Sequence, residues 1–577
     1  MVFEPPSWVP GLPEVPDSIT LEEYMYNDQY GRFPLAKSRN PYTCGVTGKT
    51  YAATEVAQRV DYLSRAIGKR LGFNPAEGTE WDRVVALYSV NTIDYIPFTH
   101  AVHRLSGIVT PANAQYSALE LEHQLATSGA KALFTCMPLL ENALKAAKAA
   151  GIPEDRVFLL EVPNTQASDK FPTIDQLIDE GKKLPAREPL KWIKGQGARQ
   201  TAYLCYSSGT SGLPKAVMIS HRNVIANVLQ VAVYDDVGRE MQGVETQNSL
   251  GVLPFSHIYG LTLVALTAQF RGDQMVVVPK FDLKGVLGTI QRFKLQFLPV
   301  VPPMLIQLIT NKDLVAQYDL SSVRVVFSGA APLGIEVIDD IKKMFPKWNV
   351  GQGYGMTEAS PVVNTSSEHD LFPGSSGSLL PGFKARIIDA EGNEVTEHDK
   401  RGELIVQSPS IVLGYLNNEK ANAETFIHLA DGRWLKTGDE ALVRKSPNGH
   451  EHIFITDRIK ELIKVKGFQV APAELEGHLL SHPYVSDCTV IPVPDDRAGE
   501  VPKAYVVRCD AEVKGKSDAE VIRAIEKHVE DHKTRYKWLK GGVEFIDAIP
   551  KSPSGKILRR LLKDKEKKER GEKGSRL

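Results

Sequence analysis

Short apolar runs alternate along this chain with longer stretches of helical periodicity. The alternation predicts parallel or mixed sheets covered by helices, and therefore an α/β fold. The runs with strand composition are residues 84–90, 132–135, 274–278 and 323–327, and the amphipathic helical stretches are residues 55–71 and 118–129.

The length of the chain and its net charge limit the classes of protein to which it can belong. A chain of 577 residues, 42% of them hydrophobic, is long enough for more than one domain with its own core. The 69 basic and 70 acidic residues nearly cancel to a net charge of −1, which argues against a nucleic-acid binder.

The character of the sequence changes twice after the helical region. Residues 389–406 alternate as strands around a Gly392 turn and predict a β-rich subdomain. From residue 457 the chain is short, charged and mixed α+β. We therefore predict a large N-terminal domain over residues 1–456, a small C-terminal domain over 457–565 with a hinge at 458–460, and a charged tail over 566–577. The charged stretch 563–573 is expected to be disordered.

The cysteines and the apolar segments of the chain indicate in which cellular compartment the protein is expected. The cysteines are odd in number and show no CxxC or Cys/His ligand spacing, so we expect reduced thiols in an intracellular protein. The N-terminus, rich in proline with an early acid, is not expected to be a signal peptide. The apolar run 261–270 is too short to span a bilayer. The cysteines are Cys44, Cys136, Cys205, Cys488 and Cys509.

Residues 206–217 form a loop rich in glycine and hydroxyl side chains that suits an anion. Gly209 and Gly212 let the backbone approach a phosphate, the hydroxyls donate hydrogen bonds, and Lys215 adds a mobile positive charge. The spacing is not that of a Walker A loop, because Lys215 is followed by Ala216. The alternative is a flexible surface loop.

Four further polar blocks follow in a fixed order, at residues 351–358, 434–439, 457–469 and 553–557. Together with residues 206–217 they resemble the motif series of the adenylate-forming (AMP-binding) superfamily. The resemblance runs from about residue 40 to about residue 565. Within the superfamily the chain is most similar to 4-coumarate:CoA ligase-like and acyl-CoA synthetase enzymes.

The resemblance implies a two-step reaction with ATP, Mg²⁺ and coenzyme A. A carboxylic acid is first joined to AMP with release of pyrophosphate, and the acyl group is then transferred to the thiol of coenzyme A. It also implies a large N-terminal domain of α/β layers and a small, mobile α+β C-terminal domain.

The charges of ATP and the resemblance to the superfamily together indicate which residues form an ATP site. Hydroxyls and Lys215 suit the β- and γ-phosphates, Thr357 the α-phosphate, Glu358 a hard Mg²⁺ ion and Asp439 the ribose hydroxyls. Read alone, Thr357 and Glu358 also suit a helix start, and Asp439 a plain turn. The expected nucleotide-binding residues are Ser207, Ser208, Gly209, Thr210, Ser211, Lys215, Gln352, Gly353, Tyr354, Thr357, Asp439, Arg458 and Lys556.

Lys556 is the residue expected to be essential for adenylation. A lysine on a glycine loop can neutralise both the substrate carboxylate and the α-phosphate; the alternative is a solvated basic tail. By resemblance, Lys460 is the hinge residue, and Lys464 and Gln469 act in thioester formation. Coenzyme A is expected to contact Lys280, Lys466 and Gly467.

The acyl pocket is expected beside residues 256–260, with His257 as a catalytic polariser or gate and Tyr259 as a wall. A structural core histidine is the alternative. Since no charged residue lies among the expected lining positions, a neutral aryl or alkyl acid fits better than an amino acid. The lining positions are Tyr259, Leu263, Ala330, Ala331, Gly353, Gly355, Pro361 and Val362.

The last residues, Ser575, Arg576 and Leu577, resemble the peroxisomal Ser-Lys-Leu address. We expect recognition by a peroxisomal import receptor, or a cytoplasmic location if the address is not read. A solvated basic tail is the alternative. Together with Met1, Val2, Phe3 and the proline-rich opening, this ending resembles fungal peroxisomal aryl- and acyl-CoA ligases, including phenylacetyl-CoA ligase-like enzymes and those of secondary-metabolite pathways.

Two related functions remain open alongside an acid:CoA ligase for an aromatic or medium-chain acid. One is a stand-alone adenylation enzyme that loads a carrier protein, and the other is a luciferase-like monooxygenase. A non-catalytic interaction protein would not be expected to keep Lys215, Glu358, Asp439, Arg458 and Lys556 together.

Overall fold

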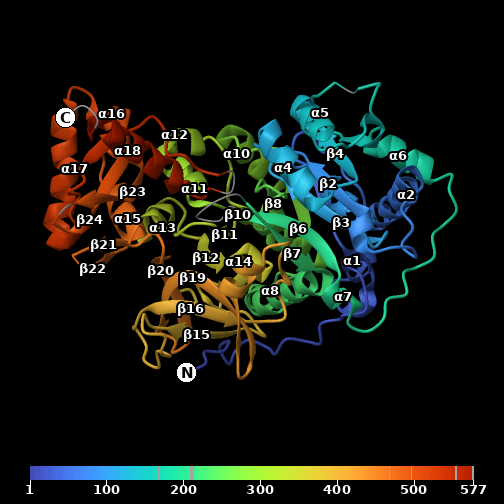
Figure 1. Cartoon of the computed structure of the whole chain (residues 1–577), viewed down its shortest axis with the longest axis horizontal. Helices are drawn as coiled ribbons and strands as arrows, with labels where there is room; N and C mark the ends of the chain where they lie inside the picture. Colours follow the sequence, from blue (N-terminus) through green and yellow to red (C-terminus); the bar gives the residue numbers. More distant parts are fainter. Residues whose placement is uncertain (167, 208–213, 467, 496, 553–554, 575–577) are drawn as a thin grey trace.

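The structure is a computed structural model that describes residues 1–166, 168–207, 214–466, 468–495, 497–552 and 555–574. Figure 1 shows a large body made of the N-terminal four-fifths of the chain and a smaller group of C-terminal elements at its left side. Within the described residues, no helix combines the length and apolar composition that a membrane span requires.

Two mostly parallel sheets, flanked by helices, form the centre of the large body, as the alternation of strands and helices predicts. Strands β2, β4, β9 and β11 match the predicted strand runs, and α2 (Ala53–Leu71) and α4 (Ala118–Ser128) match the predicted helices. In spatial order the first sheet contains β1 (Tyr42–Cys44), β9 (Gln274–Val277), β8 (Asn248–Gly251), β10 (Phe297–Val300), β11 (Val325–Ser328), β12 (Asn349–Gly355), β13 (Val362–Thr365) and β14 (Ser378–Leu379). The second contains β17 (Gly414–Tyr415), β7 (Lys215–Ser220), β6 (Thr201–Ser207), β3 (Ile108–Ala112), β2 (Val84–Tyr88), β4 (Ala132–Cys136) and β5 (Val157–Leu160).

A third, antiparallel sheet confirms the predicted β-rich region. It contains β15 (Lys384–Ile388), β16 (Gly402–Gln407), β19 (Gly432–Lys445), β18 (Phe426–Leu429) and β20 (Glu451–Arg458). A turn closed by a hydrogen bond from the Gly392 amide to the Asp389 carbonyl follows β15.

The helices of the large body cover the faces of these sheets (Figure 1). The apolar run 261–270 lies in a buried π-helical segment, η6 (Tyr259–Leu266), and the short α9 (Thr267–Phe270). The remaining helices are α1 (Leu21–Tyr26), α3 (Tyr95–His103), α5 (Leu140–Ala149), α6 (Ile174–Gly181), α7 (Gln196–Arg199), α8 (His221–Met241), α10 (Leu283–Phe293), α11 (Pro302–Thr310), α12 (Lys312–Val315), α13 (Ile335–Met344) and α14 (Glu419–Thr425).

The small body is an α+β unit with its own core. One hydrophobic cluster of buried residues reaches from Phe3 to Ile453 and a separate one from Ile463 to Leu562. The sheet of the small body contains β22 (Phe468–Val470), β21 (Ile463–Val465), β24 (Gly499–Arg508), β23 (Val485–Asp495) and β25 (Val543–Phe545). Its helices are α15 (Pro472–Leu480), α16 (Asp510–Val513), α17 (Asp518–His532) and α18 (Arg559–Gly574).

The predicted disorder of the tail is wrong for most of its length, because α18 continues to Gly574. Residues 563–574 contain no apolar side chain, and polar contacts attach this part of the helix instead. Glu566 is buried and forms an ion pair with Lys503 at 2.5 Å, and Lys565 pairs with Glu544 at 2.6 Å. Leu562 thus anchors the start of α18 in the core of the small body, and charged residues dock the rest of the helix on β24 and β25.

Candidate active site

Lys556 lies on a tight turn that packs against the large body. Gly555 has φ +81°, and a β-carbon there would lie 3.1 Å from Cγ2 of Val301, so the turn approaches Val301 closely. The Ser552 amide donates to the Lys556 carbonyl at 2.8 Å. The lysine of the small body is thereby held at the edge of the large one.

The surroundings of Lys556 combine burial with charges of both signs. Burial and the Arg458 guanidinium lower its pKa to about 8, although the carboxylates of Glu461, Asp439 and Glu358 act in the opposite direction. Four residues predicted for the site, Lys556, Arg458, Asp439 and Glu358, are thus electrostatic neighbours.

Asp439 is held by its neighbours on two strands. It faces Arg458 across the β19–β20 pair, and its Oδ1 lies 3.6 Å from Nε of Arg458. The Tyr354 hydroxyl donates to its Oδ2 at 2.5 Å. Burial raises the pKa of Asp439, while the Arg458 charge opposes that shift. The carboxylate is therefore oriented at the junction of the two bodies.

Glu358 is 7% exposed and follows Thr357 in the short 3₁₀ segment η7 (Thr357–Ala359). Its Oε1 accepts a hydrogen bond from the Tyr415 hydroxyl at 2.8 Å. Nζ of Lys215 lies 4.7 Å from the centre of the Tyr415 ring. Tyr415 thus bridges the two motifs, although the sequence analysis missed it; its only local signal is an aromatic residue after Gly414.

The glycine-rich loop joins β6 to β7, and Ser207 and Lys215 are partners across this antiparallel pair. Ser207 and Lys215 therefore stand at the base of the loop. Ser208, Gly209, Thr210 and Ser211 lie outside the described residues.

His257 and Tyr259 lie at the start of η6, close to Lys556. The Tyr259 amide donates to Nδ1 of His257 at 3.3 Å, which leaves the proton of a neutral ring on Nε2. Burial and the Lys556 charge lower the pKa of His257 to about 4. His257 is therefore neutral near pH 7 and faces the same space as Lys556.

Two of the expected lining positions are glycines that neighbouring residues approach closely. A β-carbon on Gly353 would lie 2.6 Å from Cζ of Phe327, and one on Gly355 would lie 2.3 Å from the Pro361 carbonyl oxygen. The missing side chain of Gly353 makes room for Phe327, a residue that the sequence analysis missed.

The other expected lining positions flank the ends of β11, β12 and β13. Ala330 follows β11 with φ +68°, an unusual conformation for a residue with a β-carbon. Val362 is fixed by two hydrogen bonds to the Asn227 amide group, at 2.8 and 3.1 Å. Ala331, Leu263 and Pro361 complete the set, with Leu263 packed against the large core. Gln352 accepts a hydrogen bond from the Leu333 amide at 3.3 Å, which secures the loop after β11.

The residues expected to act on coenzyme A are exposed and spread out. Lys464 and Gln469 are partners on the β21–β22 hairpin, Lys466 lies at its turn with φ +51°, and Lys280 follows β9. Gly467 lies outside the described residues. Phe468 on the same hairpin is 57% exposed and stacks on Tyr536, with ring centres 4.7 Å apart.

Lys460 is exposed in the turn between β20 and β21. The Glu461 amide donates to the Arg458 carbonyl at 2.9 Å, and the Ile459 amide donates to the Gly438 carbonyl at 3.0 Å. This single turn connects the two bodies in sequence, which is where a hinge is expected.

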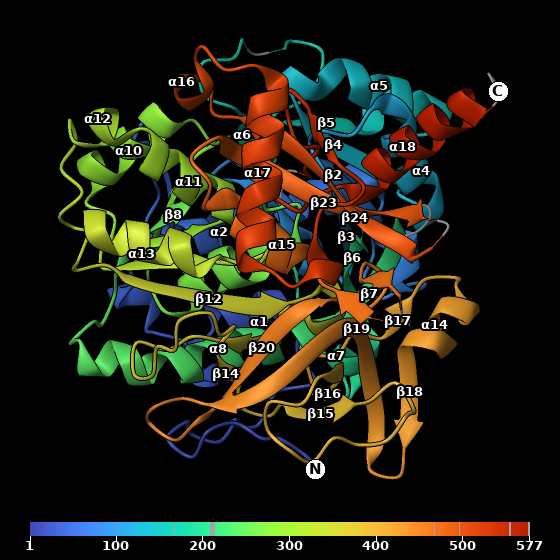
Figure 2. The same cartoon turned by 90° about the vertical axis from the view of Figure 1, so that its left-hand side faces the viewer.

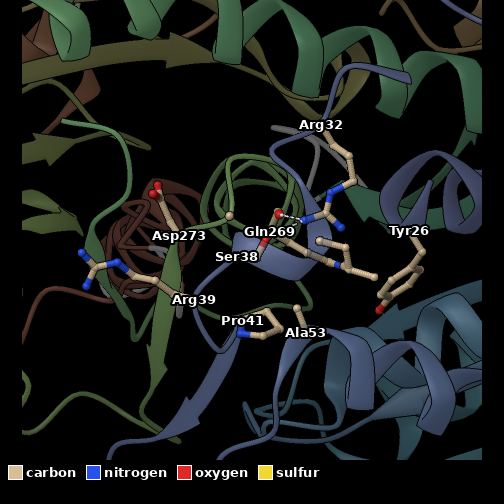
Figure 3. Close-up of a pocket in the computed structure, with 10 residues that line it drawn as sticks. Tyr26, Arg32, Ser38, Arg39, Pro41, Ala53, Gln269 and Asp273 are labelled. Atoms are coloured by element: carbon tan, nitrogen blue, oxygen red, sulfur yellow. Dashed lines mark hydrogen bonds between the residues drawn. The ribbon is translucent and has the colours of Figure 1, made fainter. Parts of the chain in front are cut away.

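The depression drawn in Figure 3 lies elsewhere and contains none of the expected site residues. Arg32 occupies it, donating to Oγ of Ser38 at 2.8 Å and to the Gln269 carbonyl at 3.5 Å. These contacts join the N-terminal segment to α9 and serve packing.

Comparisons with known proteins agree with this geometry. A family model described as AMP-binding enzyme matches residues 36–416, and one described as AMP-binding enzyme C-terminal domain matches residues 474–556. The chain is 40% identical over 569 residues to acyl-CoA ligase easD of Emericella nidulans, covering 98% of this chain and 100% of that protein. It is 41% identical over 573 residues to acyl-CoA ligase AKT1 of Alternaria alternata, covering 98% and 97%.

Among solved structures, the anthranilate CoA ligase AuaEII in complex with anthranoyl-AMP has the same fold. The TM-score is 0.79 at 22% sequence identity, and the match covers 95% of this chain and 97% of that one. ATP-bound MatB from Rhodopseudomonas palustris matches with a TM-score of 0.76 at 23% identity, covering 95% and 99%. At these identities the likeness concerns the fold.

Proposed function

The chain belongs to the AMP-binding enzyme family and is an ATP-dependent acid:CoA ligase, and we propose that it activates an aromatic or medium-chain carboxylic acid. The observation that carries the proposal is the position of Lys556. The partly buried Lys556 ammonium of the small body is an electrostatic neighbour of His257, Asp439 and Glu358 of the large one. A negative carboxylate approaching a negative triphosphate needs a cation at such a place.

In the first step, a carboxylate oxygen of the acid attacks the α-phosphorus of ATP, the bond to the bridging oxygen breaks, and pyrophosphate leaves. We assign Lys556 to the charge that develops on the carboxylate and α-phosphate. Thr357 donates to the α-phosphate, Ser207 and Lys215 contact the outer phosphates, and Asp439 accepts from the ribose hydroxyls. Gln352, Gly353, Tyr354 and Arg458 surround the rest of the nucleotide.

The carboxylate of Glu358 fits a Mg²⁺ ion. The ion prefers carboxylate oxygens and commonly uses one or two of them with substrate phosphates and water. Glu358 is buried near Lys215, the lysine assigned to the phosphates, and Tyr415 orients it by a single hydrogen bond. When bound, the ion would neutralise phosphate charge.

The acid is proposed to be neutral apart from its carboxylate, because the positions assigned to its tail are apolar or glycine. A pyrophosphate-release screen over carboxylic acids, with and without coenzyme A, tests this. Release that needs an aromatic or medium-chain acid and thioester formation with coenzyme A would support the proposal. Adenylation of amino acids without thioester formation would favour a carrier-loading enzyme, and light emission or oxygen uptake a luciferase-like enzyme.

In the second step, the thiol of coenzyme A attacks the acyl carbon and AMP leaves. Lys464 and Gln469 are exposed in this structure, so their proposed role requires a rotation of the small body about Lys460. Lys466, Gly467 and Lys280 would then contact coenzyme A.

Replacing Gln469 by alanine is expected to leave adenylation within about twofold of wild type while slowing the thioester step about tenfold or more. The reason is that Gln469 is exposed on the β21–β22 hairpin, whereas Lys556 lies on the turn that packs against the large body. Single-turnover assays of the two half-reactions separate the effects. Glu424→Gln, on the exposed face of α14, is the control. An equal loss in both steps would contradict the domain rotation.

The pH dependence of adenylation should report Lys556. Raising the pH through its lowered pKa of about 8 removes the positive charge, so kcat/KM for ATP should fall above that pH. Lys556→Arg keeps its charge at every accessible pH, and the decline should disappear from its profile. A decline that persists unchanged in the arginine variant would assign it to another group.

The peroxisomal location remains a proposal, because Ser575, Arg576 and Leu577 lie outside the described residues. Deleting these three residues from a fluorescent fusion of the printed chain is expected to shift it from punctate organelles to the cytosol, with melting temperature and catalytic rates unchanged in vitro. Punctate fluorescence after deletion, or cytosolic fluorescence before it, would show that the import receptor does not read this sequence.

A further inference from the structure

Two helices of the small body carry histidines four residues apart. His478 lies on α15 and His482 just after its end, while His528 and His532 lie on α17. Residues at i and i+4 share a helix face. The two helices pack side by side, as Figures 1 and 2 show, so the two pairs meet between them.

The rings are close together. The centres of His478 and His528 are 4.1 Å apart with an interplanar angle of 4°, and His532 is 5.0 Å from His528 and 5.3 Å from His478. One ring nitrogen from each of these three residues lies within 4.8 Å of the others. Tetrahedral zinc bonds of about 2.0–2.1 Å place ligand nitrogens roughly 3.4 Å apart. Because the His478 and His528 rings are stacked with parallel planes, one of the two rings must turn before both can point a nitrogen at one ion.

In the arrangement described, one nitrogen of each ring lies near a backbone carbonyl oxygen. His478 Nε2 is 3.2 Å from the His528 carbonyl, His528 Nε2 is 3.2 Å from the His478 carbonyl, and His532 Nδ1 is 2.8 Å from the His528 carbonyl. A carbonyl accepts, so each of these nitrogens carries the proton. In a neutral ring, Nδ1 of His478 and His528 and Nε2 of His532 then keep a lone pair. A histidine that binds a metal commonly donates its other N–H to a carbonyl in this way.

Lys533 is a positively charged residue that acts on the His478 and His528 rings. The nearby Lys533 ammonium is paired with Glu474 at 3.2 Å, which offsets part of its repulsion toward a cation. His482 stays outside the group, because its Nδ1 accepts a hydrogen bond from the Tyr484 amide at 3.2 Å.

We propose that His478, His528 and His532 bind a divalent transition-metal ion of the zinc type, completed by water, that joins α15 to α17. Imidazole suits zinc, copper and nickel, whereas Mg²⁺ prefers oxygen. The only other three-residue group among the described residues, Glu544, Glu566 and Glu569, is neutralised by Lys503 and Lys565 and carries no such inference.

The test uses the full chain freed of metal by dialysis against a chelator. Zn²⁺ is titrated in competition with a chromophoric chelator, and melting is followed with and without Zn²⁺. We expect one equivalent bound and a rise in melting temperature. Co²⁺ in its place should give visible d–d bands of a low-coordinate nitrogen site.

His532→Gln is the decisive variant, because His532 is exposed and its loss leaves the core intact. Affinity should fall by at least roughly 10- to 100-fold, and the thermal shift should disappear. His478→Gln should behave likewise, with His428→Gln, an exposed histidine of β18, as the unaffected control. No zinc-dependent shift in wild type, or a shift that both helix variants retain, would overturn the proposal.

Discussion

Lys556→Ala is expected to slow acyl-adenylate formation by roughly 10²- to 10³-fold, the cost of removing one preorganised electrostatic contact. Transfer of the acyl group from synthetic acyl-AMP to coenzyme A should remain near the wild-type rate. The ammonium lies beside His257, Asp439 and Glu358 in the arrangement described, and its charge opposes the repulsion between carboxylate and triphosphate. That repulsion is absent from the second step.

Lys551→Ala is the matched control, since Lys551 lies on the same loop but pairs with Asp487 of the small body at 2.6 Å. It should leave both half-reactions within about twofold of wild type. Equal losses of adenylation and thioester formation in Lys556→Ala, at unchanged melting temperature, would show that the lysine serves both steps.

Local patterns were sufficient to predict the elements of the large body. β2 and β4 are apolar runs buried on both faces, and α2 has a clear amphipathic spacing, so each is specified by its own residues. The family assignment rests on ordered motifs and is confirmed by matches over both bodies.

Local sequence patterns could not predict the contacts between segments that are distant in the chain. Gly353 reads as an open position until Phe327, from another strand, fills the space over it. Tyr415 carries no motif of its own, and only the pairing of β17 with β7 brings it to Lys215 and Glu358. The α18 helix is polar in sequence and becomes ordered through Lys503, far away in the chain.

The orientation of the two bodies also depends on contacts that local sequence patterns do not predict. The sequence places Lys556 on a turn and Lys464 on a hairpin, without saying which faces the large body. In the structure the turn docks against Val301 and the hairpin is exposed. The roles proposed for Lys556 and Glu358 in adenylation require this arrangement.

Glu358→Gln is therefore expected to reduce adenylation about 10²-fold or more and to raise the Mg²⁺ concentration needed for half-maximal rate. The amide keeps the shape of the side chain and can still accept the hydrogen bond from Tyr415, but it loses the negative charge that a hard cation prefers. Pyrophosphate release is measured across a Mg²⁺ titration at saturating ATP and acid.

Tyr415→Phe separates the charge of Glu358 from its orientation. It retains the carboxylate and the ring below Lys215 while removing the hydroxyl, so a smaller loss of about tenfold is expected, in line with one hydrogen bond to a charged group. Glu424→Gln should leave the Mg²⁺ dependence unchanged, because that carboxylate is exposed on α14. If Glu358→Gln lowered the rate without shifting the Mg²⁺ requirement, the carboxylate would act by positioning Tyr415 and Lys215 rather than by binding the ion. The metal ligand would then have to be sought elsewhere around the phosphates.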